Sequence, residues 1–374
     1  MNKYIEKIKE FFSKIKFSNT SKISISSKDK INLLEQLSNL LNSGIPLVNS
    51  FKIIMYQTKD KKLKNLVKEL IEKLNKGDSL KDAFSNYDNI FNIFDLSIIE
   101  MGEVTGKLGN SIETIKIKEE KSRELKTKII GALIYPMVIV GLSLAMILVF
   151  MIYVIPKITD MYKDAKVNLP ELTQNVIDVS DFLQKYVFEI IVLLIIFIIS
   201  FIIFKKNPRT KIYYDKAILY VPIFGPLIKK KILSLFTSSL GILLTNGVII
   251  NKSLEISARA LDNDYYSKEL SEIINSVSRG KNLSSCMGID EIQTGKENFL
   301  FPIELASVIK IGEETGKLAE LLTKISKKYS KQIDELVKNM QTAIEPIVIV
   351  VVGAIIGTLI MAIMLPFFNM VNVI

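Results

Sequence analysis

The sequence predicts an all-α, polytopic membrane protein, in which two tandem homologous cytoplasmic helical bundles are combined with three transmembrane helices. Three observations lead to this fold class: a long internal repeat, apolar residues spaced at a helical period, and the separation of apolar and charged residues into blocks. The 374 residues are 49% hydrophobic and 24% charged, with a mean hydropathy of +0.30. That combination fits membrane spans joined to polar domains.

The repeat has a long offset. Residues 101–108 (Met-Gly-Glu-Val-Thr-Gly-Lys-Leu) recur 210 positions later at 311–318 (Ile-Gly-Glu-Glu-Thr-Gly-Lys-Leu). Residues 40–44 (Leu-Leu-Asn-Ser-Gly) recur 203 positions later at 243–247 (Leu-Leu-Thr-Asn-Gly), and seven additional residues near 288–299 account for the change of offset. A repeat of this length indicates a duplicated domain rather than a solenoid.

Three apolar segments are long enough to cross a bilayer, which takes about 18–20 residues in a helix. They span 129–155, 187–204 and 344–368. The first and third belong to the repeat, because Pro136 and Pro156 match Pro346 and Pro366 at the offset of 210. The middle segment has no duplicate, and it returns the chain to the side on which the first bundle lies.

Flanking charge predicts the orientation of these spans. Six basic residues lie in 116–128, eight in 205–231 against one acid, and five lysines in 324–338. The segment 156–186 carries four lysines against five acids. By the positive-inside rule, the bundles 28–128 and 205–343 are cytoplasmic, whereas the loop 156–186 and the C-terminus 369–374 are extracytoplasmic.

The net charge of +10 is read in the same way, as a topology signal and not as a nucleic-acid surface. Residues 1–27 form a basic amphipathic N-terminal segment and a serine-rich linker, which could lie on the inner leaflet or bind a cytoplasmic partner. No signal peptide is expected.

Each bundle is predicted to contain about six helices. Apolar stripes at helical spacing run through 31–41 and 63–74, and glycine-containing turns separate them. Gly44, repeated as Gly247, fits a left-handed position after a helix, with Pro46 opening the next one. Asp78 or Ser79 is expected to cap a further helix. The last helix of the first bundle should run without a break into the first span.

The repeated Gly-Glu-x-Thr-Gly-Lys-Leu motif resembles a phosphate-binding loop only superficially. One residue is missing between its glycines, Leu108 replaces the magnesium-binding hydroxyl residue, and no strand precedes it. We expect a tight corner in which Gly102 ends one helix and Thr105 caps the next. The alternative is a corner that also exposes a charged docking point. The residues concerned are Gly102, Glu103, Thr105, Gly106, Lys107 and Leu108, with Gly312, Glu313, Thr315, Gly316, Lys317 and Leu318 in the second copy.

Other candidate residues lie in the spans. Pro136, Glu345 and Pro346 mark membrane boundaries, where a carboxylate could cap a helix or bind a basic partner. Small residues spaced by four could let helices pack closely, either in a homo-oligomer or against another span. They are Gly141 and Ala145 in the first span and Gly353 and Gly357 in the third.

Composition argues against catalysis. The chain has no histidine, which removes the usual general base and zinc ligand. Its one cysteine, Cys286, cannot form an internal disulfide and is read as a packing residue. No spacing predicts a cofactor or a metal site, so we expect no enzymatic activity.

The Leu-Leu-x-x-Gly turns, the repeated corners, the Tyr135-Pro136 and Glu345-Pro346 span openings and the three-span layout resemble the type II secretion protein F family. The resemblance implies a non-enzymatic inner-membrane platform of a type IV pilus or type II secretion system. It also implies partners: a cytoplasmic hexameric assembly or retraction ATPase, pilin or pseudopilin subunits, other inner-membrane assembly proteins and further copies of the chain. The alternative from another class is a small transporter or channel, which usually needs ionisable groups at mid-membrane.

Overall fold

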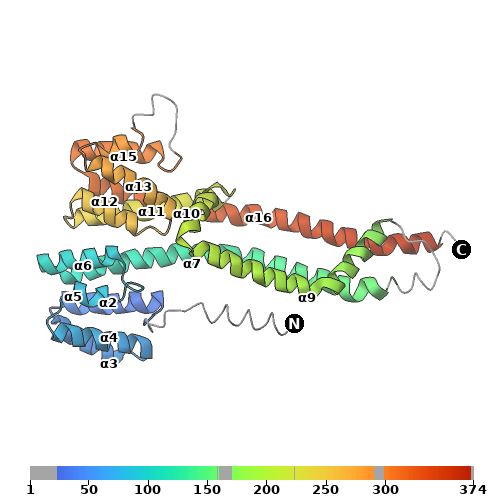
Figure 1. Cartoon of the computed structure of the whole chain (residues 1–374), viewed down its shortest axis with the longest axis horizontal. Coiled ribbons are helices and arrows are strands. Elements are labelled where there is room, and N and C mark those ends of the chain that lie inside the picture. Colours follow the sequence, from blue (N-terminus) through green and yellow to red (C-terminus); the bar gives the residue numbers. More distant parts are fainter. Residues whose placement is uncertain (1–22, 158, 160–170, 223, 290–298, 372–374) are drawn as a thin grey trace. The chain divides into compact units, whose positions relative to one another are not determined.

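The computed structural model describes residues 23–157, 159, 171–222, 224–289 and 299–371, and within these ranges all regular structure is helical (Figure 1). The all-α prediction is therefore confirmed. The chain divides into two compact units. One comprises the residues up to Lys121 with Asn246–Val248, and the other comprises Ser122–Thr245 with Ile249–Ile374. Most of the predicted N-terminal segment 1–27 lies outside the described residues.

The first bundle is built from helices whose starts are fixed by side-chain caps. Oxygen atoms of Ser26, Asp60, Ser79 and Asn92 accept N–H bonds from the first turns of four helices. Of the two predicted caps, Asp78 and Ser79, it is therefore Ser79 that caps its helix. The helices are α2 (Ser27–Asn42), α3 (Leu47–Gln57), α4 (Lys61–Asn75), α5 (Leu80–Ser85), α6 (Ile93–Thr105) and α7 (Leu108–Val149).

Aromatic rings fill the core of the first bundle. Phe84 stacks on Phe91 with ring centroids 3.9 Å apart and meets Phe51 edge-on at 6.3 Å. All three are fully buried, as are Leu34 and Leu66 from the apolar stripes of α2 and α4. Each such side chain contributes about 1.5–3 kcal/mol through burial. The helical spacing of the apolar residues therefore identified the core-facing sides.

The second bundle follows the same order. Its helices are α11 (Phe224–Thr245), α12 (Ile250–Arg259), α13 (Asp264–Val277), α14 (Leu283–Cys286), α15 (Ile303–Thr315) and α16 (Leu318–Val371). They are preceded by α10 (Pro208–Ala217) and the short η2 (Ile218–Tyr220), whose repeat counterparts lie outside the described residues. Phe236, Tyr266, Phe301 and Tyr329 fill the core, and Tyr266 donates to the carbonyl of Leu300 at 3.0 Å.

Glycine ends the first long helix of each copy. Gly44 and Gly247 have φ of 81° and 82°, the left-handed conformation that was predicted. Glycine adopts this conformation without the steric cost that a Cβ would add.

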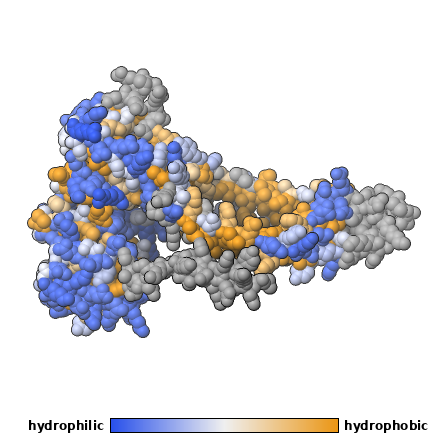
Figure 2. All heavy atoms as spheres, viewed as in Figure 1, coloured by the Kyte–Doolittle hydropathy of each residue, from blue (hydrophilic) through white to orange (hydrophobic). Residues whose placement is uncertain are grey.

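Two helical stretches of the described residues are long and apolar enough to cross a membrane, Leu108–Lys157 and Leu318–Ala362. Of the most apolar 18-residue segment of each stretch, only 11% and 6%, respectively, is buried within the chain. Figure 2 shows hydrophobic residues gathered where Figure 1 draws α7, α9 and α16. The helix of the first bundle continues into the first span as predicted, because α7 has no break between Leu108 and Val149.

The middle apolar segment 187–204 belongs to a longer helix, α9 (Glu171–Lys206). The predicted extracytoplasmic loop 156–186 therefore contains a helix over 171–186, and its side of the membrane stays a prediction. The physical reason is an amphipathic pattern in which Thr173, Ile177 and Ser180 share one buried face. Charged residues on the other face of this stretch obscured that pattern.

A buried charge network joins three helices of the first bundle. The Nζ of Lys30 on α2 lies 2.6 Å from Asp95 on α6 and 3.2 Å from Glu119 on α7. Lys118 on α7 lies 3.3 Å from Asp95 and 3.1 Å from Glu119. Asp95 is fully buried. Burial alone would lower the pKa of Lys118, but Asp95 and Glu119 hold that pKa above its ordinary value.

The second bundle replaces this network with apolar packing. At the repeat offsets, the positions of Lys30, Asp95 and Glu119 are taken by Leu233, Leu305 and Tyr329, and all three are buried in one apolar cluster. The two copies thus share a fold but differ in the chemistry that holds the long helix to its bundle.

We predict that Asp95→Ala lowers the free energy of unfolding by about 3–5 kcal/mol, because the two ammonium groups of Lys30 and Lys118 then share only the Glu119 carboxylate and one positive charge is left uncompensated. Asp334→Ala is the matched control, since Asp334 pairs with Lys128 at 3.0 Å in an exposed position. The control should cost less than about 1 kcal/mol. Urea unfolding of the detergent-solubilised full chain, followed by circular dichroism, measures both. Equal midpoints would show that the network does not stabilise the bundle.

Candidate functional site

The repeated corners are the main candidate sites, and the structure revises how they are built. Gly106 and Gly316 follow α6 and α15 with φ of 68° and 69°, so these residues end the helices. The predictions that Gly102 ends a helix and that Thr105 caps the next one are wrong. Thr105 donates to the carbonyl of Met101 in its own helix at 2.7 Å. The second Gly of the motif, not the first, adopts the conformation that only glycine adopts readily.

Gly102 and Gly312 lie inside their helices for a different reason. A Cβ on Gly102 would lie 2.7 Å from the Cβ of Ser111, and one on Gly312 would lie 2.8 Å from the Cα of Leu318. Both distances are well inside van der Waals contact. The first glycine of each motif therefore allows the helix after the corner to pack closely against the helix before it.

The repeated glutamate caps a helix elsewhere in its bundle. Oxygen atoms of Glu103 accept from the backbone N–H of Leu80 at 2.5 Å and of Lys81 at 3.4 Å, at the start of α5. Glu313 does the same at the start of α14, accepting from Leu283 at 2.7 Å and Ser284 at 3.2 Å. A carboxylate here satisfies N–H groups that have no partner within the helix.

These contacts bear on the alternative that each corner exposes a charged docking point. Because Glu103 and Glu313 bind backbone groups of their own bundles, they do not form the exposed charged pair that the alternative required. Lys107 and Lys317 are exposed and form no ion pair with any described residue. The lysines are therefore exposed charged groups of the corners, and docking of a partner there stays a prediction. The sequence carried a signal for the cap, since each glutamate recurs together with a Gly-x-x-Leu turn at 77–80 and 280–283.

The candidate residues of the spans make few internal contacts. Pro136 lies inside α7 and Pro346 inside α16. The side chain of Glu345 lies outside the described part of the structure. A Cβ placed on Gly141, Gly353 or Gly357 would meet no atom within 4 Å. The predicted close-packing faces are thus uncovered in a single described chain, and their pairing stays a prediction.

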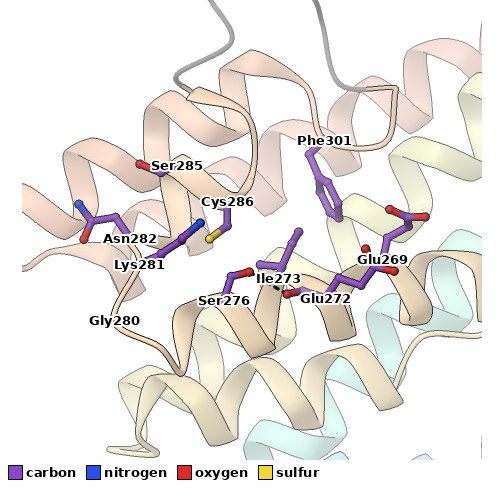
Figure 3. Close-up of a pocket in the computed structure, with 10 residues that line it drawn as sticks. All are labelled: Glu269, Glu272, Ile273, Ser276, Gly280, Lys281, Asn282, Ser285, Cys286 and Phe301. Atoms are coloured by element: carbon purple, nitrogen blue, oxygen red, sulfur yellow. Dashed lines mark hydrogen bonds between the residues drawn. The ribbon is translucent and has the colours of Figure 1, made fainter.

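A pocket of about 660 Å³ opens in the second bundle beside α13 and α14 (Figure 3). Glu269, Glu272 and Lys281 give it charge, and Phe301 lies at its apolar side. The side chain of Ser276 donates to the backbone of Glu272 at 3.1 Å. No histidine exists to activate the Cys286 thiol. The pocket offers charged and hydroxyl groups for binding.

In the first bundle, Tyr87 covers the equivalent face of α4. Its hydroxyl donates to Glu69, which corresponds to Glu272, and its ring lies beneath the Nζ of Lys73 at 5.4 Å. Burial and the neighbouring Glu69 raise the pKa of the Tyr87 hydroxyl. Within the described residues, no group of three or more His, Cys, Asp or Glu side chains could hold a metal ion.

Comparison with known proteins gives a consistent match. Residues 33–156 and 236–366 both match the family model described as type II secretion system (T2SS), protein F. The two matched segments cover both copies of the repeat.

Relatives match over nearly the whole chain. The type IV pilus assembly protein PilC of Pseudomonas aeruginosa is 28% identical over 342 residues, covering 91% of this chain and 89% of its own length. The protein of the same name from Myxococcus xanthus is 25% identical, covering 94% and 82%. The type II secretion system protein F of Vibrio cholerae is 23% identical, covering 93% and 84%.

We predict that Glu103→Ala and Glu313→Ala each lower the free energy of unfolding by about 1–3 kcal/mol, because partly buried N–H groups lose their acceptor. Hydrogen exchange should accelerate at Leu80 in the first variant and at Leu283 in the second. Lys107→Ala and Lys317→Ala, in the same corners, should leave both rates unchanged. Unaltered exchange in the glutamate variants would mean that the carboxylates do not cap these helices.

Proposed function

Because the chain belongs to the type II secretion system protein F family, we propose that it is a non-enzymatic platform protein of a type IV pilus or a related secretion machine. The observation that supports this most is the coverage: the family model matches both copies of the repeat, and relatives named for type IV pilus assembly align with more than nine-tenths of the chain. The absence of histidine supports a scaffold over a hydrolase.

The proposed topology has three crossings of the cytoplasmic membrane. The helices α7 and α16 supply the first and third, and the 187–204 part of α9 supplies the second. Lysine and arginine flank the bundle ends of these helices, which favours cytoplasmic bundles and an extracytoplasmic C-terminus. Two crossings, by α7 and α9, separate the first bundle from the second. The crossing by α9 lets both copies of the repeat face the same compartment.

Continuous helices supply a mechanism for coupling. The 42 residues of α7 extend about 63 Å at 1.5 Å per residue, from the first bundle into the span. The 54-residue α16 connects the second bundle to the third span in the same way. A force or rotation that a hexameric ATPase applies to a bundle would be transmitted along a stiff helix to the membrane, where pilin subunits enter or leave the filament. Other inner-membrane assembly proteins would complete the machine.

The proposed platform is a homo-oligomer. The spans leave large apolar side chains exposed, and the small-residue faces at Gly141 and Gly353 are uncovered. Helices with such faces associate in membranes through close backbone contact. Lipid would cover the remaining apolar surface.

In a strain that lacks this gene, we predict that surface filaments are absent while pilin accumulates in the membrane. The parent chain should restore filaments, and so should a variant with alanine at Lys121, Arg123 and Glu124, three exposed positions of α7. Glycine at the same three positions should not, because each glycine weakens the helix by about 1 kcal/mol and interrupts the transmission.

Electron microscopy of shed filaments measures the outcome, and co-purification with the motor ATPase is the control. The parent chain, the alanine variant and the glycine variant should all co-purify with the ATPase. Filaments in the deletion strain would defeat the proposed function, whereas filaments with the glycine variant would defeat only the coupling through α7.

A further inference from the structure

The unduplicated helix α9 donates hydrogen bonds to the backbones of both repeat-related spans. The hydroxyl of Thr173 donates to the carbonyl of Ala362 in α16 at 2.8 Å. The hydroxyl of Ser180 and the side-chain amide of Gln184, the latter at 3.2 Å, donate to the carbonyl of Met151. Side chains of one helix thus reach main-chain acceptors in two others.

The carbonyl of Ala362 is available because of a proline. In an α-helix, the carbonyl of residue 362 accepts from the N–H of residue 366. Residue 366 is a proline and has no N–H to donate. Thr173 therefore supplies a bond that α16 cannot make for itself.

The carbonyl of Met151 is available for the equivalent reason. Residues Phe150–Val154 form a π-helix, η1, in which the N–H of Ile155 donates to the carbonyl of Phe150. In this register the next donor, to Met151, would be residue 156. That residue is Pro156, the repeat partner of Pro366. Both prolines of the duplicated pair thus leave an acceptor without a donor in its own helix, and α9 supplies both donors.

The three donors lie on one face of α9. Thr173, Ile177, Ser180 and Gln184 follow the spacing of a single helical stripe. Ile177 packs with Met151, Ile155 and Leu359 in a small apolar cluster between the donors. Thr173 and Ser180 are 2% and 0% exposed, whereas Leu142 and Leu193 elsewhere on the spans are 68% and 69% exposed.

We propose that Thr173, Ser180 and Gln184 form a clamp that fixes the two proline-interrupted spans to α9. In this proposal α9 connects the first and third spans through hydrogen bonds, in addition to crossing the membrane. An unsatisfied carbonyl in an apolar environment is unfavourable, so the clamp holds the spans together at the level of their second prolines. This inference stands whether or not a motor ATPase acts on the bundles.

A double-mutant cycle tests the clamp. Thr173→Val keeps the side-chain volume and removes the donor, and it should raise the unfolding equilibrium constant about threefold in an SDS titration of the full chain. Pro366→Ala restores an N–H to α16, so Thr173→Val should have little effect in that background. The same cycle applies to Ser180→Ala combined with Gln184→Leu, with and without Pro156→Ala.

Two control substitutions outside α9 separate the clamp from general loss of packing. Ser143→Ala and Thr358→Val remove hydroxyls that bond only within their own helices, to Ile139 and Ala354, and they should unfold like the parent. Thr173→Ser keeps the donor and should also behave like the parent. Equal losses for Thr173→Val with and without Pro366→Ala would overturn the proposal, as would losses no larger than those of the two controls.

Discussion

The whole structure depends on one constraint: each backbone N–H or carbonyl removed from water needs a hydrogen-bonding partner. Duplication of the chain duplicated the backbone groups that its own helices cannot satisfy. At the starts of α5 and α14, Glu103 and Glu313 supply the acceptor from a distant helix. Beside the paired prolines of the spans, Thr173 and Ser180 supply the donors. In both places a side chain far away in sequence supplies the hydrogen-bonding partner that a helix lacks. These bonds fix the helices relative to one another.

The two copies have diverged within this shared frame. A buried network around Asp95 holds α7 to the first bundle, whereas Leu305 and Tyr329 hold α16 to the second through apolar contact. Ion pairs with good geometry impose orientation, and apolar packing allows more adjustment. The two bundles thus share a fold while their long helices are attached by different interactions.

Sequence patterns predicted the features that depend on neighbouring residues or on the internal repeat. The offsets of 203 and 210 identified the duplication, apolar spacing identified the core-facing sides of helices, and Gly44 and Gly247 identified two turns. They did not reveal the role of Glu103, whose partner lies 23 residues earlier, nor the pairing of Lys30 with Asp95 across 65 residues. Such contacts are set by tertiary packing. The helix over 171–186 was missed because its exposed charges resembled those of a loop.

In the proposed topology both bundles face one compartment. Cysteine variants on a Cys286→Ser background test this directly, with a membrane-impermeant maleimide applied to spheroplasts before and after lysis. Lys76→Cys and Ser271→Cys, at exposed positions of the first and second bundles, should react only after lysis, whereas Asp178→Cys on α9 should react before it. Reaction of Ser271→Cys in intact spheroplasts would place the second bundle outside and contradict the proposed topology.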